Sequence, residues 1–414
     1  MCRLPRLAVW LVAAVLLMPL LTVSSAQAVA DHTRTVRWET PARLAAGAFD
    51  GVRLDGNAVV LSSPTRTRTH TDPFGAKKPV RWSYGSWTSP WTSSGTQANH
   101  LVPSWGATMP HGTWLRVLVR VKRGSSTGSW DVVGEWAYGP NSINRASGLA
   151  QTDDLAKVAV DTVRANPNKR FSSWQVRVEL LRKPGSSATP RLRSVSAAVS
   201  SYGTRSVATS RTTMTATREL RVPSFSQMTH RGHFPQWGGG GEAWCSPTSI
   251  AMVLRYAGRG PAASKYQWAG TDGQVDHAAR YSYDHRYRGT GNWGFSTAYA
   301  AHHGADAFVT RLSDLRDAEA FIRAGIPLVV SVRFGRGELS GAPISSTNGH
   351  LLVIRGFTKD GRVIANDPAG ATNSAVRRAY DRAQLERAWL RGSGGITYVV
   401  RAPGTALPAD TLRW

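Results

Sequence analysis

Cys245 is the residue of this sequence best placed to act as a nucleophile. It directly precedes residues 246–257, in which apolar side chains recur at helical spacing, so the sequence predicts a cysteine at the head of a helix. Backbone N–H groups and the helix dipole at that end favour the thiolate, which is the attacking form of cysteine. The glycine run 238–241 in front of it lets the backbone pass close to a bound substrate. A small, inert cysteine that begins an ordinary helix is the alternative.

His350 is the histidine best placed to serve as a base for this thiol. It opens an apolar strand pattern, and the turn residues 358–361 lead into a second apolar stretch that ends at Asp367. Antiparallel pairing around that turn sets His350 roughly opposite residues 367–370. We therefore expect the Asp367 carboxylate to reach the imidazole and fix its tautomer. A capping or turn role for Asp367 before Pro368 is the alternative.

Gln227 carries the amide that acyl transfer needs beside the thiol. It closes the segment 222–227, which begins this part of the chain. A glutamine amide beside the thiolate can donate to the oxyanion formed during acyl transfer, together with the backbone N–H of Cys245. The loss of one such donor typically costs about 3 kcal/mol of transition-state stabilisation.

Gly241, Trp244 and Trp293 are expected to line the substrate groove. Gly241 closes the glycine run, Trp244 directly precedes the cysteine, and Trp293 follows a turn that contains glycine. Core packing explains both tryptophans almost as well, because aromatic side chains commonly fill protein interiors.

The remaining histidines do not form a recognisable metal site in the sequence. The Asp-His pairs at 276–277 and 284–285 and the His-His pair at 302–303 match no zinc-binding spacing, and no cysteine partners accompany them. His230 and His233 lie in the approach to the glycine run, where nothing favours them over His350 as the base. The sequence therefore predicts no metal site and no cofactor.

Residues 1–30 are typical of a secretory signal peptide. Two arginines precede the apolar run 7–21, and small residues at 26–30 offer cleavage sites. Cleavage would remove Cys2 and leave Cys245 as the single thiol of an exported protein, which favours a reactive role. An uncleaved membrane anchor is the alternative. We expect a secreted, extracellular protein with no transmembrane span after signal cleavage.

The rest of the chain divides into two parts with different periodicity. Residues 31–202 alternate apolar and polar side chains between turns, which predicts an all-β accessory domain resembling a sandwich or jelly roll. Its Trp82, Trp87 and Trp91 either stack on a sugar or, as we favour, fill the core. Residues 203–217 are rich in Thr and Ser and predict a linker.

Residues 218–414 predict an α+β domain, because helical patterns come first and strand patterns later. The expected helices are 246–257, 314–324 and 380–390, and the expected strands are 327–332, 351–357 and 363–365.

The chain of 414 residues is basic, with 51 Lys+Arg against 26 Asp+Glu and a formal net charge of +25. The charge is diffuse and accompanies no nucleic-acid-binding motif, so no specific nucleic-acid partner is expected. A solvated basic surface favours anionic partners, and an anionic cell-envelope surface is one of them.

Four motifs in this order resemble the papain-fold cysteine peptidases related to the double-glycine leader peptidases, in particular their exported, stand-alone actinobacterial members. The motifs are residues 222–227, 244–249, 349–357 and 366–369. The resemblance implies Cys245 as nucleophile, His350 as general base and then acid, Asp367 as orienting group and Gln227 as oxyanion donor. It also implies a papain-like fold over residues 218–414 and a peptide or protein substrate.

Three alternatives remain open from the sequence. A transglutaminase-like acyl transferase would use the same three groups with an amine in place of water. A cell-wall peptide amidase is a related hydrolase. A non-catalytic secreted protein that binds glycans or cell surfaces belongs to a different class, and the set of Gln227, Cys245, His350 and Asp367 argues against it.

Overall fold

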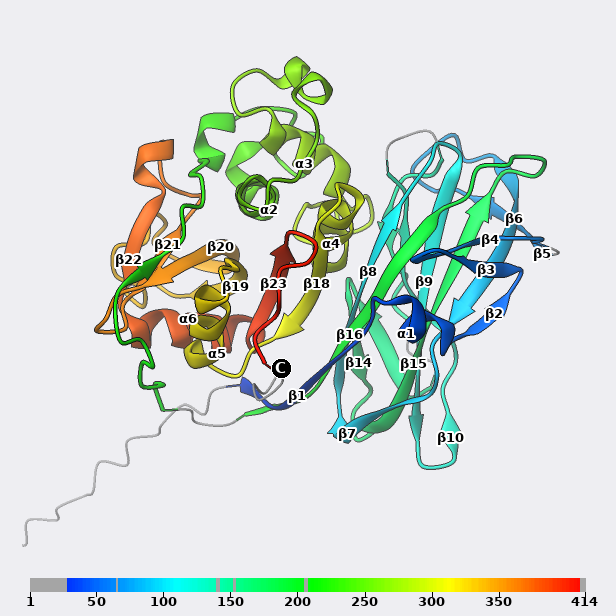
Figure 1. Cartoon of the computed structure of the whole chain (residues 1–414), viewed down its shortest axis with the longest axis horizontal. Coiled ribbons are helices and arrows are strands. Elements are labelled where there is room, and N and C mark those ends of the chain that lie inside the picture. Colours follow the sequence, from blue (N-terminus) through cyan, green and yellow to red (C-terminus); the bar gives the residue numbers. More distant parts are fainter. Residues whose placement is uncertain (1–27, 65, 139–141, 152–153, 205–207, 410–414) are drawn as a thin grey trace, which may run out of the picture.

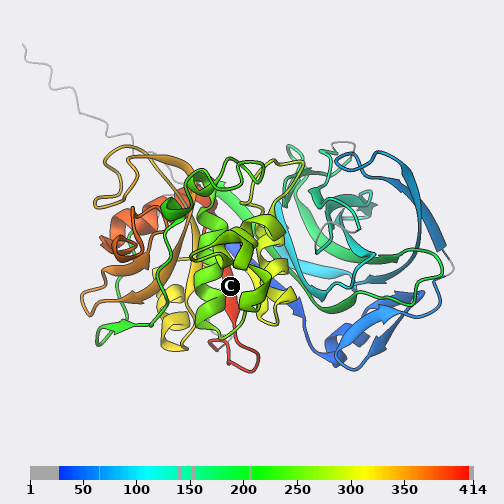
Figure 2. The same cartoon turned by 90° about the horizontal axis from the view of Figure 1, so that it is seen from above.

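The computed structural model describes residues 28–64, 66–138, 142–151, 154–204 and 208–409. Residues 1–27, which hold most of the predicted signal peptide, lie outside the described residues. The chain forms two domains side by side, an N-terminal one drawn in blue to green and a C-terminal one in green to red (Figures 1 and 2). Strands dominate the fold, and most of the helices belong to the C-terminal domain.

Two antiparallel sheets make up the N-terminal domain. The first has seven strands in the order β13-β14-β8-β16-β4-β3, with β1 paired to β16. Its strands are β1 (Ala28–Trp38), β3 (Val52–Asp55), β4 (Ala58–Leu61), β8 (His100–Thr108), β13 (Ala156–Ala159), β14 (Thr162–Ala165) and β16 (Arg191–Thr204). The short helix α1 (Pro41–Ala45) follows β1.

The second sheet has nine strands in the order β12-β11-β9-β15-β6-β2, with β10 paired to β9, β5 to β6 and β7 to β15. Its strands are β2 (Ala48–Asp50), β5 (Arg66–Thr71), β6 (Pro79–Thr88), β7 (Thr92–Ala98), β9 (Thr113–Arg123), β10 (Ser126–Thr127), β11 (Asp131–Trp136), β12 (Ala146–Ser147) and β15 (Phe171–Arg182). Apart from α1, the regular elements of the N-terminal domain that the structure describes are strands, which agrees with the alternation of apolar and polar residues in the sequence.

The two sheets share one hydrophobic core. Trp105 and Val195 of the first sheet lie in the same buried cluster as Val117 and Val178 of the second. Removing this apolar surface from water is the main force that holds the sheets together. Trp87 belongs to this core, Trp82 fills a smaller buried cluster, and Trp91 is 39% exposed. Most of this tryptophan group therefore packs the interior.

The C-terminal domain is built on a third antiparallel sheet, with the strand order β18-β23-β19-β20-β21-β22 and β17 paired to β20. Its strands are β17 (Arg218–Glu219), β18 (Asp306–Arg311), β19 (Leu328–Phe334), β20 (Thr347–Phe357), β21 (Val363–Asn366), β22 (Arg377–Tyr380) and β23 (Ile396–Arg401). Its helices are α2 (Cys245–Tyr256), α3 (Gln274–Ser282), α4 (Trp293–His302), α5 (Leu315–Arg323) and α6 (Arg382–Ser393). Short 3-10 helices are η1 (Gln227–His230), η2 (Gly241–Ala243), η3 (Ala263–Lys265), η4 (Gln267–Ala269) and η5 (Asn373–Ala375).

The last helix begins later than the sequence pattern predicts. Asp381 caps α6, because its carboxylate accepts a hydrogen bond of 2.9 Å from the backbone N–H of Gln384. Tyr380, which we expected to begin the helix, is instead the last residue of β22. Across the described residues, no helix has both the length and the apolar character that a membrane crossing requires.

Residues 203 and 204 of the predicted linker are the end of β16, and residues 208–217 are bonded to the C-terminal domain. The backbone N–H of Ser210 donates to Glu386 at 2.8 Å, and that of Thr213 donates to Glu319 at 2.7 Å. Met214 is buried in the C-terminal core. Hydroxyl and amide donors of this segment thus satisfy two carboxylates that would otherwise be costly to bury.

Helix α4 connects the two domains. It lies against β8 (Figure 1), and its Phe295 and Ala298 are buried in the core of the N-terminal domain. At its first residue, the backbone N–H of Trp293 donates to the carboxylate of Asp161 of the N-terminal domain at 2.7 Å. The interface between the domains therefore fixes the start of a helix that lies next to α2.

Candidate active site

Cys245 is the first residue of α2 and is partly exposed. Its sulfur forms hydrogen bonds with the ring of His350 and with the backbone N–H groups of Leu351 and Ser246. Burial opposes the charged form, but the hydrogen bond from His350 and its charge, with the two N–H groups, lower the pKa of the Cys245 thiol below its ordinary value. The structure therefore favours a thiolate at this position.

His350 lies between the thiol and a carboxylate. Its Nε2 is 2.8 Å from Oδ1 of Asp367, which leaves Nδ1 for the sulfur of Cys245. Asp367 follows β21 and is held by two more donors, the hydroxyl of Tyr380 at 2.7 Å and the backbone N–H of Ala369 at 3.0 Å. Both the His350 ring and the Asp367 carboxylate are buried, so each has one defined orientation.

The charges of Cys245, His350 and Asp367 stabilise one another. Burial alone would lower the pKa of His350, but the charge and hydrogen bond of Asp367 and the contact with Cys245 raise it to about 10. Burial would likewise raise the pKa of Asp367, and the charge and hydrogen bond of His350 instead lower it. The arrangement thus favours a thiolate and an imidazolium in contact over a neutral pair.

Gln227 begins η1, and its backbone joins it to the loop that carries Asp367. Its N–H donates to the carbonyl of Pro368 at 2.8 Å. Its side-chain Nε2 donates to the carbonyl of Glu242 at 2.6 Å, close before Cys245 in the chain. An amide nitrogen carries two hydrogens, so one donor of Gln227 remains after this bond.

Gly241 and Trp244 lie in the interior, in contrast to the groove position expected of them. A Cβ atom on Gly241 would lie 2.2 Å from the carbonyl oxygen of His230, so the glycine allows close contact between backbone segments. Trp244 is 0% exposed, and its indole N–H donates to the carbonyl of Trp237 at 2.8 Å. Both residues hold the turn that leads into α2 and offer no surface to a substrate.

Trp293 is half-buried at the start of α4, where its backbone binds Asp161. Tyr287, which is 49% exposed, is a nearby residue that no sequence pattern indicated. Burial and the charges of Asp161 and Cys245 raise the pKa of the Tyr287 phenol, so its ring lies within the field of the candidate nucleophile. Sequence patterns also did not indicate Tyr380 or Asp161. Tyr380 comes from the later strand β22, and Asp161 comes from the N-terminal domain.

The histidine pairs considered as metal ligands are engaged in protein contacts. His277 bonds the Tyr299 hydroxyl at 2.8 Å, and the ring of His302 stacks on Tyr138 with 3.6 Å between centroids. Asp284 accepts a hydrogen bond from Asn292 at 2.9 Å. Among the described residues, a different group brings three metal-ligating side chains together: His230, His233 and Asp276.

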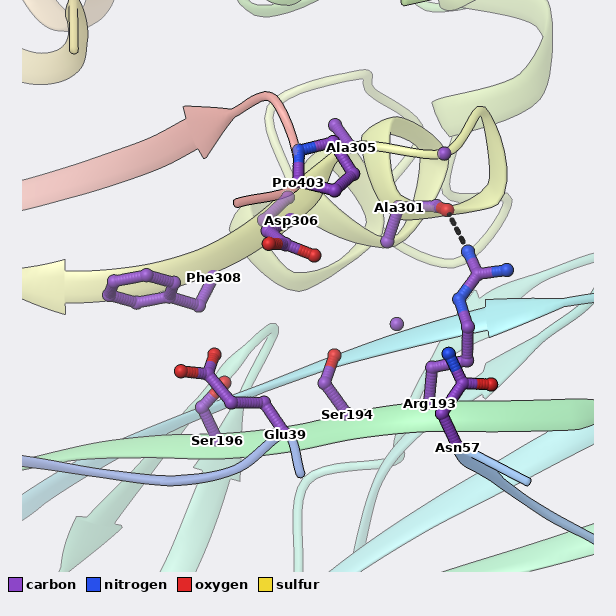
Figure 3. A pocket seen from close by; sticks show the side chains of 13 residues that line it. Glu39, Asn57, Arg193, Ser194, Ser196, Ala301, Ala305, Asp306, Phe308 and Pro403 are labelled. Atoms are coloured by element: carbon purple, nitrogen blue, oxygen red, sulfur yellow. Dashed lines mark hydrogen bonds between the residues drawn. The ribbon is translucent and has the colours of Figure 1, made fainter. Parts of the chain in front are cut away.

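A pocket of about 270 Å³ lies between the domains, away from these residues (Figure 3). The Arg193 guanidinium at its edge donates to the carbonyl of Ala301 at 2.6 Å, which ties β16 to α4. Its lining also includes Glu39 and Asp306, and none of the residues around Cys245. The pocket is part of the domain interface.

Two family models match the chain. The Peptidase C39 N-terminal domain matches residues 34–200, and the Peptidase C39 like family matches residues 219–395. No curated protein matches the chain.

Two solved structures show weak similarity. One is a candidate C39-like peptidase from Bacillus anthracis, 16% identical, which covers 45% of this chain and 98% of its own with a TM-score of 0.30. The other is a xylanase 10C mutant from Cellvibrio japonicus in complex with xylopentaose, 13% identical, with 48% of this chain and 31% of that chain covered and a TM-score of 0.18. Both TM-scores are too low to support an inference about function.

Proposed function

We propose that this chain, which belongs to the C39-like peptidase family, is a secreted cysteine peptidase that cleaves peptide or amide bonds through an acyl-thioenzyme. The observation that carries the proposal is the position of His350, which bonds the Cys245 sulfur on one side and Asp367 on the other. Nucleophile, base and orienting group in this order are what acyl transfer by a thiol requires.

In the first step the Cys245 thiolate attacks the carbonyl carbon of the substrate, and the carbonyl oxygen becomes an oxyanion. The backbone N–H of Cys245 and the remaining amide hydrogen of Gln227 are the proposed donors to that oxyanion. The His350 imidazolium then gives its Nδ1 proton to the leaving amine, the C–N bond breaks, and an acyl-thioenzyme remains.

In the second step His350, now neutral, takes a proton from water as the water attacks the thioester carbonyl. Collapse of this second oxyanion releases the carboxylic acid and returns the thiolate. Asp367 holds Nε2 of His350 throughout and stabilises the imidazolium, and the hydroxyl of Tyr380 keeps the carboxylate in line.

The finer features of the architecture are part of the proposal. We assign a papain-like α+β fold to the C-terminal domain and a β-sandwich to the N-terminal domain, supported by the helix-then-strand order and by the core that the two N-terminal sheets share. The N-terminal domain would hold the enzyme on an anionic cell-envelope surface, which the net charge of +25 supports. Secretion rests on the pattern of residues 1–30.

The test is hydrolysis of a peptide library and labelling by iodoacetamide, with wild type, Cys245→Ala and the control His32→Ala compared. We expect Cys245→Ala to lose both labelling and hydrolysis, because the structure lowers the pKa of the Cys245 thiol. His32→Ala, which changes an exposed residue of the N-terminal domain, should retain both. Equal turnover by wild type and Cys245→Ala would refute the mechanism. Product analysis with a primary amine present separates hydrolysis from acyl transfer.

A further inference from the structure

A tight turn brings two histidine rings together next to the glycine run. His230 ends η1, and its carbonyl accepts a hydrogen bond of 3.0 Å from the backbone N–H of His233. Arg231 has φ −55° and ψ 129°, and Gly232 has φ +74°, which are the angles of a type II β-turn. Only glycine adopts the second of these conformations without strain, so the His-Arg-Gly-His segment is suited to this geometry.

Asp276 faces both histidines from α3. One carboxylate oxygen is 2.8 Å from Nδ1 of His230, and the other is 3.0 Å from Nδ1 of His233. One nitrogen of each ring and one carboxylate oxygen all lie within 4.8 Å of one another. Atoms that bind one zinc ion at about 2.0–2.2 Å in tetrahedral geometry are separated by roughly 3–4 Å, so this spacing suits a shared cation.

The polar atoms of the group are incompletely satisfied by the protein. His230 is 1% exposed and Asp276 is 0% exposed. Neither ring nitrogen of His230 makes a hydrogen bond, and Oδ2 of Asp276 makes none either, although it lies only 2.8 Å from Nδ1 of His230. The distance between these two atoms would allow a hydrogen bond, but the direction of the N–H does not. Buried polar groups without partners are rare in proteins, and a bound ion is one explanation for them.

The group also has a path to solvent. The His233 side chain is 39% exposed and lines a hollow of about 670 Å³, together with Thr229, Phe234 and Trp268. A cation held by the three residues would thus keep an open coordination position toward this hollow, where water completes its shell.

We propose that His230, His233 and Asp276 bind one divalent transition-metal cation of the zinc class. Two imidazole nitrogens and a carboxylate oxygen are a ligand set that zinc accepts, whereas calcium and magnesium prefer oxygen ligands alone. Residue spacing did not indicate this site, because Asp276 is 43 residues from His233 and belongs to a different element.

The cation would stabilise the segment that carries Gln227, the proposed oxyanion donor of the candidate active site. The element that ends at His230 begins at Gln227, and the His230 carbonyl packs against Gly241, which opens the turn into α2. A metal between η1 and α3 therefore fixes the segment that carries Gln227. The binding site itself stands on its own geometry and does not depend on the activity of Cys245.

The test is calorimetric titration of the metal-free full chain with zinc chloride, in a Cys245→Ala background so that the thiol cannot compete for zinc. We expect one ion per chain and a rise in melting temperature that grows with the zinc concentration. His233→Ala and Asp276→Asn should each lower the affinity by about 100-fold or more, since each removes a direct ligand. His32→Ala, which changes an exposed histidine of the N-terminal domain, should bind as the parent does.

Two results would overturn the site: no saturable binding by the Cys245→Ala parent, or equal affinity in the parent and His233→Ala. The half-exposed His233 makes its alanine variant the one expected to fold, so it decides the matter if Asp276→Asn does not fold. Copper(II) gives an independent readout, because the ring centre of Trp244 is 6.5 Å from that of His230 and its fluorescence should be quenched in the parent and less so in His233→Ala.

Discussion

Two buried histidine–aspartate groups lie in the C-terminal domain, and they differ in how the protein satisfies the carboxylate. Asp367 accepts hydrogen bonds from His350, Tyr380 and Ala369, so both of its oxygens have partners. Asp276 has the same burial and two histidine neighbours, yet its Oδ2 makes no hydrogen bond. The complete network orients an imidazole for proton transfer, and the incomplete one leaves lone pairs that suit a cation.

The largest effect should come from removing the histidine of the complete network. We expect His350→Ala to reduce kcat/KM for a cleavable peptide by about 10⁴-fold, because neither thiolate formation nor protonation of the leaving amine has a substitute. His32→Ala is the control and should leave the rate unchanged. A His350→Ala variant within tenfold of wild type would mean that a different group serves as the base.

Replacing the carboxylate tests whether its charge matters as well as its position. Asp367→Asn should lower kcat by about 10³-fold. The charge of Asp367 raises the pKa of His350 and burial lowers it, so loss of the charge moves that pKa downward. The alkaline limb of the pH–rate profile, where the imidazolium loses its proton, should therefore shift to lower pH. An unshifted limb would show that Asp367 only fills space.

Gln227→Ala tests the oxyanion side. Loss of one preorganised donor should reduce kcat by about 10²-fold with KM little changed, because the bond forms only as the oxyanion develops. Gln227→Glu keeps the size of the side chain but removes the amide donor, so it should be no better than alanine. If KM alone rises, Gln227 binds the substrate rather than the oxyanion.

A third group of histidines, His277, His302 and His303, should make the stability of the protein depend on pH. Burial lowers the pKa of His277 and His302 to about 3 and that of His303 to about 4, in a cluster with Tyr138 and near Arg280. In the unfolded chain these groups titrate near 6.5, so below that pH the unfolded state binds more protons. Stability should therefore fall as the pH drops from about 6.5 toward 4.

We expect the melting temperature to fall by roughly 5 °C or more over this range, as followed by circular dichroism. His302→Gln, which cannot take up a proton, should reduce the slope. A flat profile between these pH values would contradict the burial of the cluster.

The sequence predicted the parts of the site that depend on local order. The cysteine precedes a helical stripe, so its place at the head of α2 followed from periodicity. The turn at residues 358–361 fixes a hairpin, and pairing around it brought Asp367 to the His350 ring, where the atoms are 2.8 Å apart. Tyr380 could not be found in this way, because a separate strand and loop carry it to the carboxylate.

What the sequence missed depends on tertiary contacts. Trp244 was expected beside the substrate, but its neighbour Trp237 and the turn before α2 draw it into the interior. Asp161 reaches the start of α4 from the other domain, and Asp276 meets His230 from another helix. Residue spacing does not show which distant segments contact each other in the fold. Metal-binding patterns with short spacing therefore did not indicate the group of His230, His233 and Asp276.

The most direct test of the central claim is detection of the acyl-thioenzyme. Wild type is mixed with a cleavable peptide ester, quenched in acid within the first turnover and digested, and the peptide that contains Cys245 is measured by mass spectrometry. The structure predicts a mass increase equal to the acyl group on Cys245 and none in Cys245→Ala, since the thiol of Cys245 is the one held by His350. Turnover with no adduct on Cys245, or with the adduct on another residue, would contradict the account.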